Sequence, residues 1–392
     1  MTTTTGILDA VEGIQDTFIT LRRDLHRHPE LAYDEVRTAA LVRSQLADMG
    51  IPIVAELATT GLVAAIQSGS GTRSIGLRAD MDALAIDEQT NLAHASTVEG
   101  VMHACGHDGH VAMLLAAANH LATTRNFDGT VYLIFQPAEE GGGGAKVMVD
   151  QGLFDQFPMD EIYALHSWPA LRTGTIAVSP GPVMASTNDF EITLHGPGGH
   201  AAFPHLSADL IGLAATIVTH LRSLTTSTLP PGTESTLAVT SVNGGTAINA
   251  FPTSVSIRGT LRAFSDQIVD TIERHMREPI DLMARAAGAT ATVTLNRIYP
   301  PTINSPKPAR RAEEVATTLV GAERVVTQTP AMTSEDFSFM LAEAPGAYVF
   351  IGTGSEDRVA PLHSPLFDFD DDALPVGAGL LIGLAEASLA AR

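Results

Sequence analysis

Residues 111–165 read VAMLLAAANHLATTRNFDGTVYLIFQPAEEGGGGAKVMVDQGLFDQFPMDEIYAL, and apolar runs alternate with helical patterns along them. Periodicity predicts a helix over Val111–Leu121 and a strand over Thr130–Phe135. A second helix over Ala145–Gln151 and a second strand over Glu161–Leu165 follow. Because strands alternate with helices, we expect an α/β fold with a mostly parallel sheet flanked by helices.

The residues before this stretch predict two more helices and two more strands. Apolar residues three and four apart over Ile7–His28 predict one amphipathic helix, which ends at Pro29. Another helix is expected over Glu35–Met49, followed by strands over Gly61–Gln67 and Ser74–Ala79. We expect these elements to join the same layered domain.

The order of the predicted elements changes after Gly181. A strand, a helix, two strands, a helix and a strand are expected in turn over Phe190–His195, Ala208–Leu224, Thr236–Val242, Ser254–Ala263, Asp266–Ala287 and Thr290–Asn296. That β-α-β-β-α-β order is typical of a small ferredoxin-like α+β domain.

The α/β texture returns after Pro300-Pro301. A helix is predicted over Lys307–Val320, a strand over Tyr348–Gly352 and a final helix from Leu374. The sequence therefore predicts a discontinuous larger domain, residues 1–182 and 299–392, that is interrupted by an inserted domain, residues 183–298.

Composition limits the classes of protein to which the chain can belong. Asp and Glu number 44 against 23 Lys and Arg, a net charge of −21, which argues against binding to nucleic acid or to an anionic membrane. Cys105 is the single cysteine, so an intrachain disulfide is excluded. Met1–Gly6 lacks the pattern of a signal peptide, and the apolar tracts near Val111–Leu121 and Leu374–Ala385 are shorter than the roughly 20 residues of a membrane span. We expect a cytoplasmic protein.

Residues 103–110, HACGHDGH, form the densest group of side chains that could bind a metal ion. Cys105 and His107 are two residues apart, and in an extended segment they would project to the same side. A thiolate and an imidazole could then bind one transition-metal ion. The alternative is a buried cysteine among scattered surface histidines.

A second group, QPAEEG at residues 136–141, follows a predicted strand. In extended chain Glu139 and Glu140 would point in opposite directions, which suits a split role in which one binds metal and the other transfers a proton. A polar loop without chemistry is the alternative. Asp80 and Asp82 also follow a predicted strand, and one of them could orient a metal ligand.

Two further histidines follow predicted strands. His166 comes after Glu161–Leu165, and His363 follows Tyr348–Gly352. Because the carboxyl ends of strands in open α/β sheets meet at one crevice, we expect one metal site built from Cys105, His107, Glu140, His166 and His363. Sulfur, nitrogen and oxygen donors together suit Zn²⁺, Mn²⁺, Co²⁺ or Ni²⁺, and five ligands indicate two ions.

Two sequence motifs that would indicate a different catalytic chemistry are missing. The sequence contains neither a G-x-x-x-x-G-K-[ST] phosphate loop nor a G-x-S-x-G nucleophile elbow. Cys105 as a nucleophile flanked by histidines remains an alternative.

The motifs as a set resemble one family. LRRDLHRHPEL, GLRADMDAL, GVMHACGHDGH, FQPAEEGGGGAKVM, GPVMAS, GPGGHAAFPH, GGTAINAFP, RGTLRAF, TSEDFSFM and LHSPLF run in family order from Leu21 to Phe367. The chain resembles the aminoacylase/carboxypeptidase-like zinc metallopeptidases, in the amidohydrolase subgroup of hippurate hydrolases, indole-acetyl-amino-acid hydrolases and N-acyl-L-amino acid amidohydrolases. It departs from the subgroup at Ala85, where a proline is usual, and around His94.

The resemblance implies roles for these residues. It implies a dinuclear site with the five ligands named above, two Zn²⁺ or Mn²⁺ ions with Co²⁺ or Ni²⁺ left open, and Glu139 as the general base. The inserted domain would be a lid that also forms a homodimer, with a tetramer left open. His200 would cross from the partner subunit to stabilise the oxyanion, and Asn249 and Arg262 would hold the carboxylate of the substrate.

The implied reaction is hydrolysis of small N-acyl-L-amino acids, hippurate-like, N-acetyl or aryl-acetyl, to a carboxylic acid and a free amino acid. Three alternatives stay open on the sequence. The same scaffold could serve a dipeptidase or carboxypeptidase, the metal could belong to a non-catalytic ligand sensor, or Cys105 could serve a cysteine hydrolase.

Overall fold

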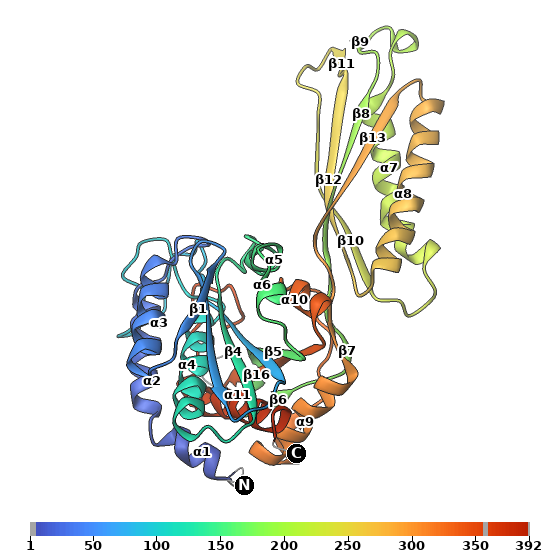
Figure 1. The fold of residues 1–392 in the computed structure, drawn as a ribbon. Helices are drawn as coiled ribbons and strands as arrows, with labels where there is room; N and C mark the ends of the chain where they lie inside the picture. The colour runs from blue at the N-terminus through green and yellow to red at the C-terminus, as the bar shows by residue number, and fades with distance from the viewer. Residues whose placement is uncertain (1–4, 356–359, 391–392) are drawn as a thin grey trace. The chain divides into compact units, whose positions relative to one another are not determined.

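The computed structural model describes residues 5–355 and 360–390, so Met1–Thr4 of the amino-terminal expectation lie outside it. The chain divides into two compact units (Figure 1). The first comprises residues 1–181, 303–329 and 336–392, and the second comprises residues 182–302 and 330–335. Residues 330–335 thus join the second unit although they lie far along the chain from the rest of it.

An eight-stranded mixed sheet forms the centre of the first unit. Its strand order is β1-β2-β4-β3-β5-β16-β6-β15. The central strands β4, β3, β5 and β16 pair in parallel, whereas β1 and β2 join antiparallel at one edge. The strands are β1 (Ile53–Leu57), β2 (Gly61–Ser68), β3 (Ser74–Asp80), β4 (Gly129–Gln136), β5 (Glu161–Arg172), β6 (Ile176–Ala177), β15 (Val325–Val326) and β16 (Gly346–Gly354).

Helices cover this sheet, and α4 and α11 pack against each other within the main core (Figure 1). Both helices are rich in alanine and leucine and are buried on nearly every side, which explains why they read as long apolar tracts. The helices are α1 (Thr5–Glu12), α2 (Gln15–Arg27), α3 (Val36–Asp48), α4 (His107–Thr124), α5 (Gly144–Asp150), α6 (Leu153–Gln156), α9 (Pro306–Val320), α10 (Ser338–Glu343) and α11 (Leu374–Ser388), with 3₁₀ turns at Ala322–Arg324 and Asp371–Ala373.

The single helix predicted over Ile7–His28 is wrong. The chain leaves the helical conformation at Gly13 and Ile14, so α1 and α2 are separate helices. Glycine in a helix interior costs about 1 kcal/mol relative to alanine, and a break there preserves the apolar spacing on either side. Periodicity alone could not reveal the break.

The second unit has the predicted β-α-β-β-α-β order. Its antiparallel sheet runs β10-β12-β8-β13, and α7 and α8 lie side by side on one face of it (Figure 1). This is the strand order of a ferredoxin-like fold. The elements are β8 (Thr187–His195), α7 (Leu210–Thr228), β10 (Ser235–Gly244), β12 (Ser254–Ala263), α8 (Asp266–Ala286) and β13 (Thr290–Tyr299).

A separate core holds the second unit together. Buried and less buried residues alternate along β12, and α8 buries every third or fourth residue, so both turn one apolar face inward. Smaller elements complete this part of the chain: β7 (Gly181–Met184), β9 (Gly199–His200), a 3₁₀ turn (Pro204–Leu206), β11 (Ala250–Phe251) and β14 (Thr302–Asn304). No helix within the described ranges has both the length and the apolar character needed to cross a membrane.

Candidate metal centre

Cys105 and His107 lie where the chain enters α4. Gly106 between them has φ 86°, in the left-handed region that glycine adopts readily, and His107 is the first residue of the helix. A Cβ at Gly106 would come within 2.5 Å of Ser167 Oγ, so this position also requires the absence of a side chain. The extended segment predicted here is therefore wrong, and a tight turn brings the thiol and the imidazole together instead.

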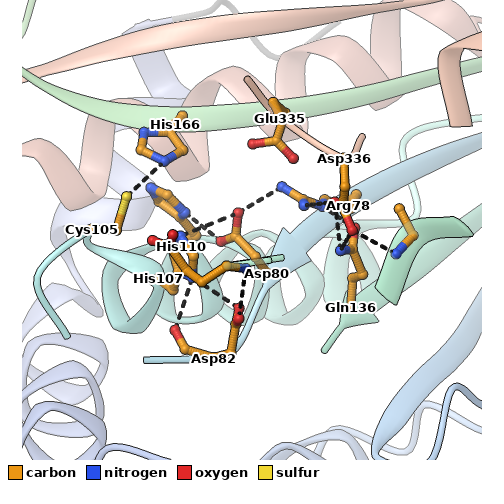
Figure 2. A network of polar contacts seen from close by, with 12 residues as sticks. Arg78, Asp80, Asp82, Cys105, His107, His110, Gln136, His166, Glu335 and Asp336 are labelled. Atoms are coloured by element: carbon orange, nitrogen blue, oxygen red, sulfur yellow. Dashed lines mark hydrogen bonds and ion pairs between the residues drawn. The ribbon is translucent and has the colours of Figure 1, made fainter. Parts of the chain in front are cut away.

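The five side chains predicted as ligands come together in the first unit. Cys105 Sγ lies 3.3 Å from His166 Nε2, and Figure 2 shows these two groups facing each other. Donor atoms of Cys105, His107 and His166 lie within 4.8 Å of one another, and so do those of Cys105, Glu140 and His363. Two clusters that share Cys105 suit a site for two ions.

His363 reaches this cluster from the far end of the chain. Its backbone N–H donates to Ala104 O at 2.8 Å, which fastens the segment beside the residue that precedes Cys105. Its backbone is in the left-handed region, with φ 63°, and its Nε2 lies 3.1 Å from Glu140 Oε1. His166, predicted to follow a strand, instead lies within β5, which is longer than expected.

Hydrogen bonds orient two of the imidazoles. His107 Nδ1 lies 2.9 Å from Asp82 O and 3.2 Å from Asp82 Oδ1, and His166 Nδ1 lies 2.7 Å from Ser167 O. Donation through Nδ1 leaves each Nε2 with its lone pair directed to the cluster. The Nε2 of His107 is fully buried and makes no hydrogen bond to any described residue. A buried imidazole nitrogen without a hydrogen-bond partner is what a metal ion would satisfy in place of a proton.

A network of buried hydrogen bonds lies next to the cluster (Figure 2). His110 Nδ1 donates to Asp80 Oδ1 at 2.5 Å, and His110 Nε2 accepts the N–H of Ser167 at 2.9 Å. Arg78 donates to Asp80 Oδ2 at 2.6 Å and to Asp336 Oδ1 at 3.2 Å. Sequence reasoning missed Arg78, His110 and Asp336 as parts of the site. Arg78 could have been found, because it lies two residues before Asp80 and therefore on the same face of the fully buried β3.

Carboxylates give the cluster an excess of negative charge. Burial alone would lower the pKa of His107, but Asp80 and Asp82 raise it to about 10. Burial raises the pKa of the Cys105 thiol, and the charge of Glu140 raises it further. The carboxylates that contribute to both shifts favour added positive charge in this pocket. The donor set and the charge thus fit divalent transition-metal ions.

Glu139 and Glu140 lie on a tight turn after β4. The expectation that they point in opposite directions is wrong, because their carboxylates and His107 offer donor atoms within 4.8 Å of one another. Ala138 accounts for the difference: with φ 56° its backbone is not extended, and a turn follows directly after it. A left-handed backbone costs a non-glycine residue roughly 1–2 kcal/mol. A Cβ at Gly144 would come within 1.8 Å of Pro137 O, which explains part of the glycine run that follows.

The remaining predicted site residues belong to the second unit. His200 pairs with Ala250 between β9 and β11, and the N–H of Ala201 donates to Asn249 O at 2.9 Å, so His200 and Asn249 lie close together on an exposed two-stranded antiparallel sheet. Arg262 on β12 is half-buried and donates to Thr187 Oγ1 at 2.7 Å. The five predicted metal ligands and Glu139 belong wholly to the first unit.

Known proteins resemble the chain over nearly its whole length. A family model described as Peptidase family M20/M25/M40 matches residues 76–387. The YXEP protein of Bacillus subtilis, whose crystal structure is described as that of a dinuclear metal-binding peptidase from the M20 family, superposes with a TM-score of 0.87 at 33% identity. That match covers 97% of this chain and 99% of the other.

Three curated relatives have names that point to amide hydrolysis. The IAA-amino acid hydrolase ILR1-like 4 of Arabidopsis thaliana is 38% identical, over 94% of this chain and 85% of that protein. Thermostable carboxypeptidase 1 of Saccharolobus solfataricus is 36% identical, over 97% and 96%. The hippurate hydrolase of Campylobacter jejuni is 34% identical, over 97% and 98%.

Proposed function

Because the chain belongs to the peptidase family M20/M25/M40, we propose that it is a metal-dependent amidohydrolase that cleaves N-acyl-L-amino acids to a carboxylic acid and a free amino acid. The observation that carries the proposal is the cluster of Cys105, His107, Glu140, His166 and His363 beside a further carboxylate, Glu139. The substrate class follows the relatives named as hydrolases of hippurate and of IAA-amino acids.

The five clustered side chains would hold two divalent transition-metal ions, Zn²⁺ or Mn²⁺, with Co²⁺ or Ni²⁺ as alternatives. When bound, such ions supply Lewis acidity, which polarises a carbonyl and lowers the pKa of water toward about 7. Asp82 keeps the His107 ring in the tautomer that offers Nε2, through the contact at Nδ1.

Glu139 serves as the general base and then as the general acid. Its carboxylate takes a proton from the attacking water as the new C–O bond forms at the amide carbon. The same proton then passes to the leaving nitrogen as the C–N bond breaks, so the products are a carboxylic acid and a free amine. Glu139 is buried, which keeps bulk water from competing for that proton.

The second unit would act as a lid and as the surface of a homodimer. His200, supplied by a second copy of the chain, would donate to the oxyanion, and loss of one such donor typically costs about 10²–10³ in rate. Asn249 and Arg262 would bind the carboxylate of the substrate, for which Arg262 offers positive charge on a chain that is strongly negative overall. We also propose a cytoplasmic location, with which a single cysteine and therefore no intrachain disulfide is consistent.

A carboxypeptidase or dipeptidase activity is the second candidate. It is favoured by the relative named Thermostable carboxypeptidase 1, which matches over nearly the full length of both chains. The same five ligands and the same base would serve this reaction, so the two activities differ only in the acyl group that is accepted.

A metal and substrate screen tests the proposal. Protein stripped of metal is reloaded with Zn²⁺, Mn²⁺, Co²⁺ or Ni²⁺ and assayed for amine release from acetyl-, benzoyl- and indole-acetyl-amino acids and from dipeptides. Turnover of acyl amino acids that requires metal supports the amidohydrolase. Faster turnover of the peptides would favour the second candidate, and no metal-dependent release from any substrate would refute both.

A further inference from the structure

A carboxylate from the beginning of α3 binds the turn that carries Glu139. Glu35 is completely buried. Its Oε1 accepts the backbone N–H of Ala138 at 2.9 Å, and its Oε2 accepts the hydroxyl of Thr60 at 2.6 Å. Glu35 therefore contacts the residue directly before Glu139 without belonging to the metal cluster.

The backbone of Ala138 has an unusual conformation, and its N–H donates to a side chain, that of Glu35. Its φ of 56° lies in the left-handed region, which L-residues with a side chain rarely adopt. Such a conformation persists when the surroundings fix it. The carbonyl of Ala138 accepts from Gly144 N at 3.0 Å, and its N–H is bound by Glu35, so both backbone polar groups of this residue are held.

A different carboxylate holds the next part of the turn. The N–H of Glu140 donates to Asp82 Oδ2 at 2.9 Å, and the hydroxyl of Tyr33 donates to Gly142 O at 2.8 Å. Glu139 thus lies between one amide bound by Glu35 and another bound by Asp82. Glu35 binds the amide directly before Glu139, whereas Asp82 binds the amide of Glu140. Removing Glu35 should therefore displace the proposed base, Glu139, more than the predicted metal ligand, Glu140.

We propose that Glu35 is a positioning residue for the reaction, which fixes the left-handed turn at Ala138 and thereby aims the carboxylate of Glu139. This inference rests on the role proposed for Glu139. It assigns a positioning role to a glutamate that lies 103 residues before Ala138 in the sequence and that carries out no chemistry itself.

Two variants separate position from charge. Glu35→Leu removes both acceptors, and we expect kcat to fall about 100-fold with KM changed less than about threefold, because a misplacement near 1 Å can cost that much. Glu35→Gln keeps an oxygen for Ala138 N–H and can donate its amide to Thr60 Oγ1, so kcat should stay within about fivefold of the wild type. Equal losses in both variants would overturn the proposal, and so would near-normal kcat in Glu35→Leu.

A third variant and a matched control complete the test. If Glu35→Leu does not fold, Glu35→Asp keeps the charge but is one methylene too short, and its kcat should also fall at least tenfold; normal kcat would refute the proposal. Glu30→Leu is the control: Glu30 accepts the N–H groups of Arg37 and Thr38 at 2.9 and 2.7 Å and so caps the same helix. It should lower stability and leave kcat within about twofold.

Hydrogen exchange distinguishes failure of this inference from failure of the proposed function. In metal-loaded protein the amide of Ala138 should exchange at least tenfold faster in Glu35→Leu than in the wild type or Glu30→Leu. Unchanged exchange would overturn the positioning role even if catalysis fell. If the wild type hydrolyses no acyl amino acid while exchange rises as expected, the proposed reaction fails but the hold on the turn stands.

Discussion

At the scale of single residues, the side chain of Asp82 contacts two of the predicted metal ligands. One carboxylate oxygen lies 3.2 Å from His107 Nδ1 and the other accepts the N–H of Glu140 at 2.9 Å, so one side chain orients two predicted ligands. Loss of such a partner typically costs about 10–100-fold in metal affinity. We predict that loss for Asp82→Ala, measured by competition with a chelator.

Asp160→Ala is the matched control for this prediction. Asp160 accepts the N–H of Ser74 at 2.9 Å, at the opposite end of the strand that leads to Asp82. Its removal should leave metal affinity unchanged. Equal weakening in both variants would mean that general loosening of β3, rather than orientation of ligands, explains the result.

Residue types and motifs in the sequence were enough to select the five candidate ligands, which the structure brings together. The residues that support them could not be selected in the same way. Arg78 and Asp336 are separated by 258 positions, and Glu35 and Ala138 by 103, so these contacts exist only after folding. Motif reasoning identifies side chains whose chemistry is unusual, whereas a supporting arginine or glutamate resembles any other.

At the scale of elements, a buried ion pair ties α2 to α4. Arg22 Nε lies 3.0 Å from Asp108 Oδ2, next to His107, and Arg22 Nη2 donates to Asp368 Oδ1 at 2.9 Å. Removing one member of a buried pair leaves an uncompensated charge and costs about 3–5 kcal/mol. We predict a loss of that size for Arg22→Met in denaturant unfolding.

An exposed pair provides the control for the buried one. Arg43 on α3 lies 2.7 Å from Glu56, and both side chains are about half exposed. Pairs of this kind are worth at most about 1 kcal/mol. If Arg43→Met lowers the free energy of unfolding as much as Arg22→Met does, burial of the α2–α4 ion pair does not explain the loss.

His26 on α2 also contacts Asp108 of α4, and we expect this contact to make the stability of the protein depend on pH. Burial alone would lower the pKa of His26, but Asp108, 2.8 Å from Nδ1, raises it to about 9. The folded state therefore binds this proton more tightly than the unfolded state, whose pKa is 6.5. The stabilisation is complete below pH 6.5 and is lost as the pH rises through about 9.

Unfolding experiments at pH 6 and 9 test the contribution of His26. A shift from 6.5 to about 9 corresponds to about 3 kcal/mol. We predict that wild-type protein loses more stability between these pH values than His26→Asn does, by up to that amount. Parallel declines in the two proteins would show that His26 is not the group responsible.

Periodicity predicted most long elements to within a few residues, including α8 and β12. It failed where a local backbone conformation overrides the pattern. Gly13 separates α1 from α2, Gly106 turns the chain directly into α4, and Ala138 ends the extended conformation before the two glutamates. The turn at Gly13 and the positive φ at Gly106 and Ala138 leave the apolar spacing on either side unchanged, so a periodic pattern cannot reveal them.

At the scale of the whole molecule, the interrupted order of elements was readable because the second unit carries a complete β-α-β-β-α-β pattern of its own. The return of residues 330–335 to that unit was not readable, because a short irregular segment has no periodicity. Whether two copies share one active site is a separate question, which activity measurements can answer.

Subunit mixing tests the proposed shared site. Glu139→Gln and His200→Ala chains should each be nearly inactive. When they exchange subunits, a mixed dimer would contain one site with an intact Glu139 and an intact His200 from the other copy, so some activity should return. Proven exchange without any recovery would exclude a role for His200 across the dimer.

The central claim is that Glu139 moves the proton at a metal centre built from Cys105, His107, Glu140, His166 and His363. The most direct measurement compares Glu139→Gln with the wild type for metal content and for hydrolysis of an N-acyl amino acid. We predict unchanged metal content and a fall in kcat of about 10²–10⁴, the usual contribution of a general base. Near-normal kcat in a fully loaded Glu139→Gln protein would contradict the claim.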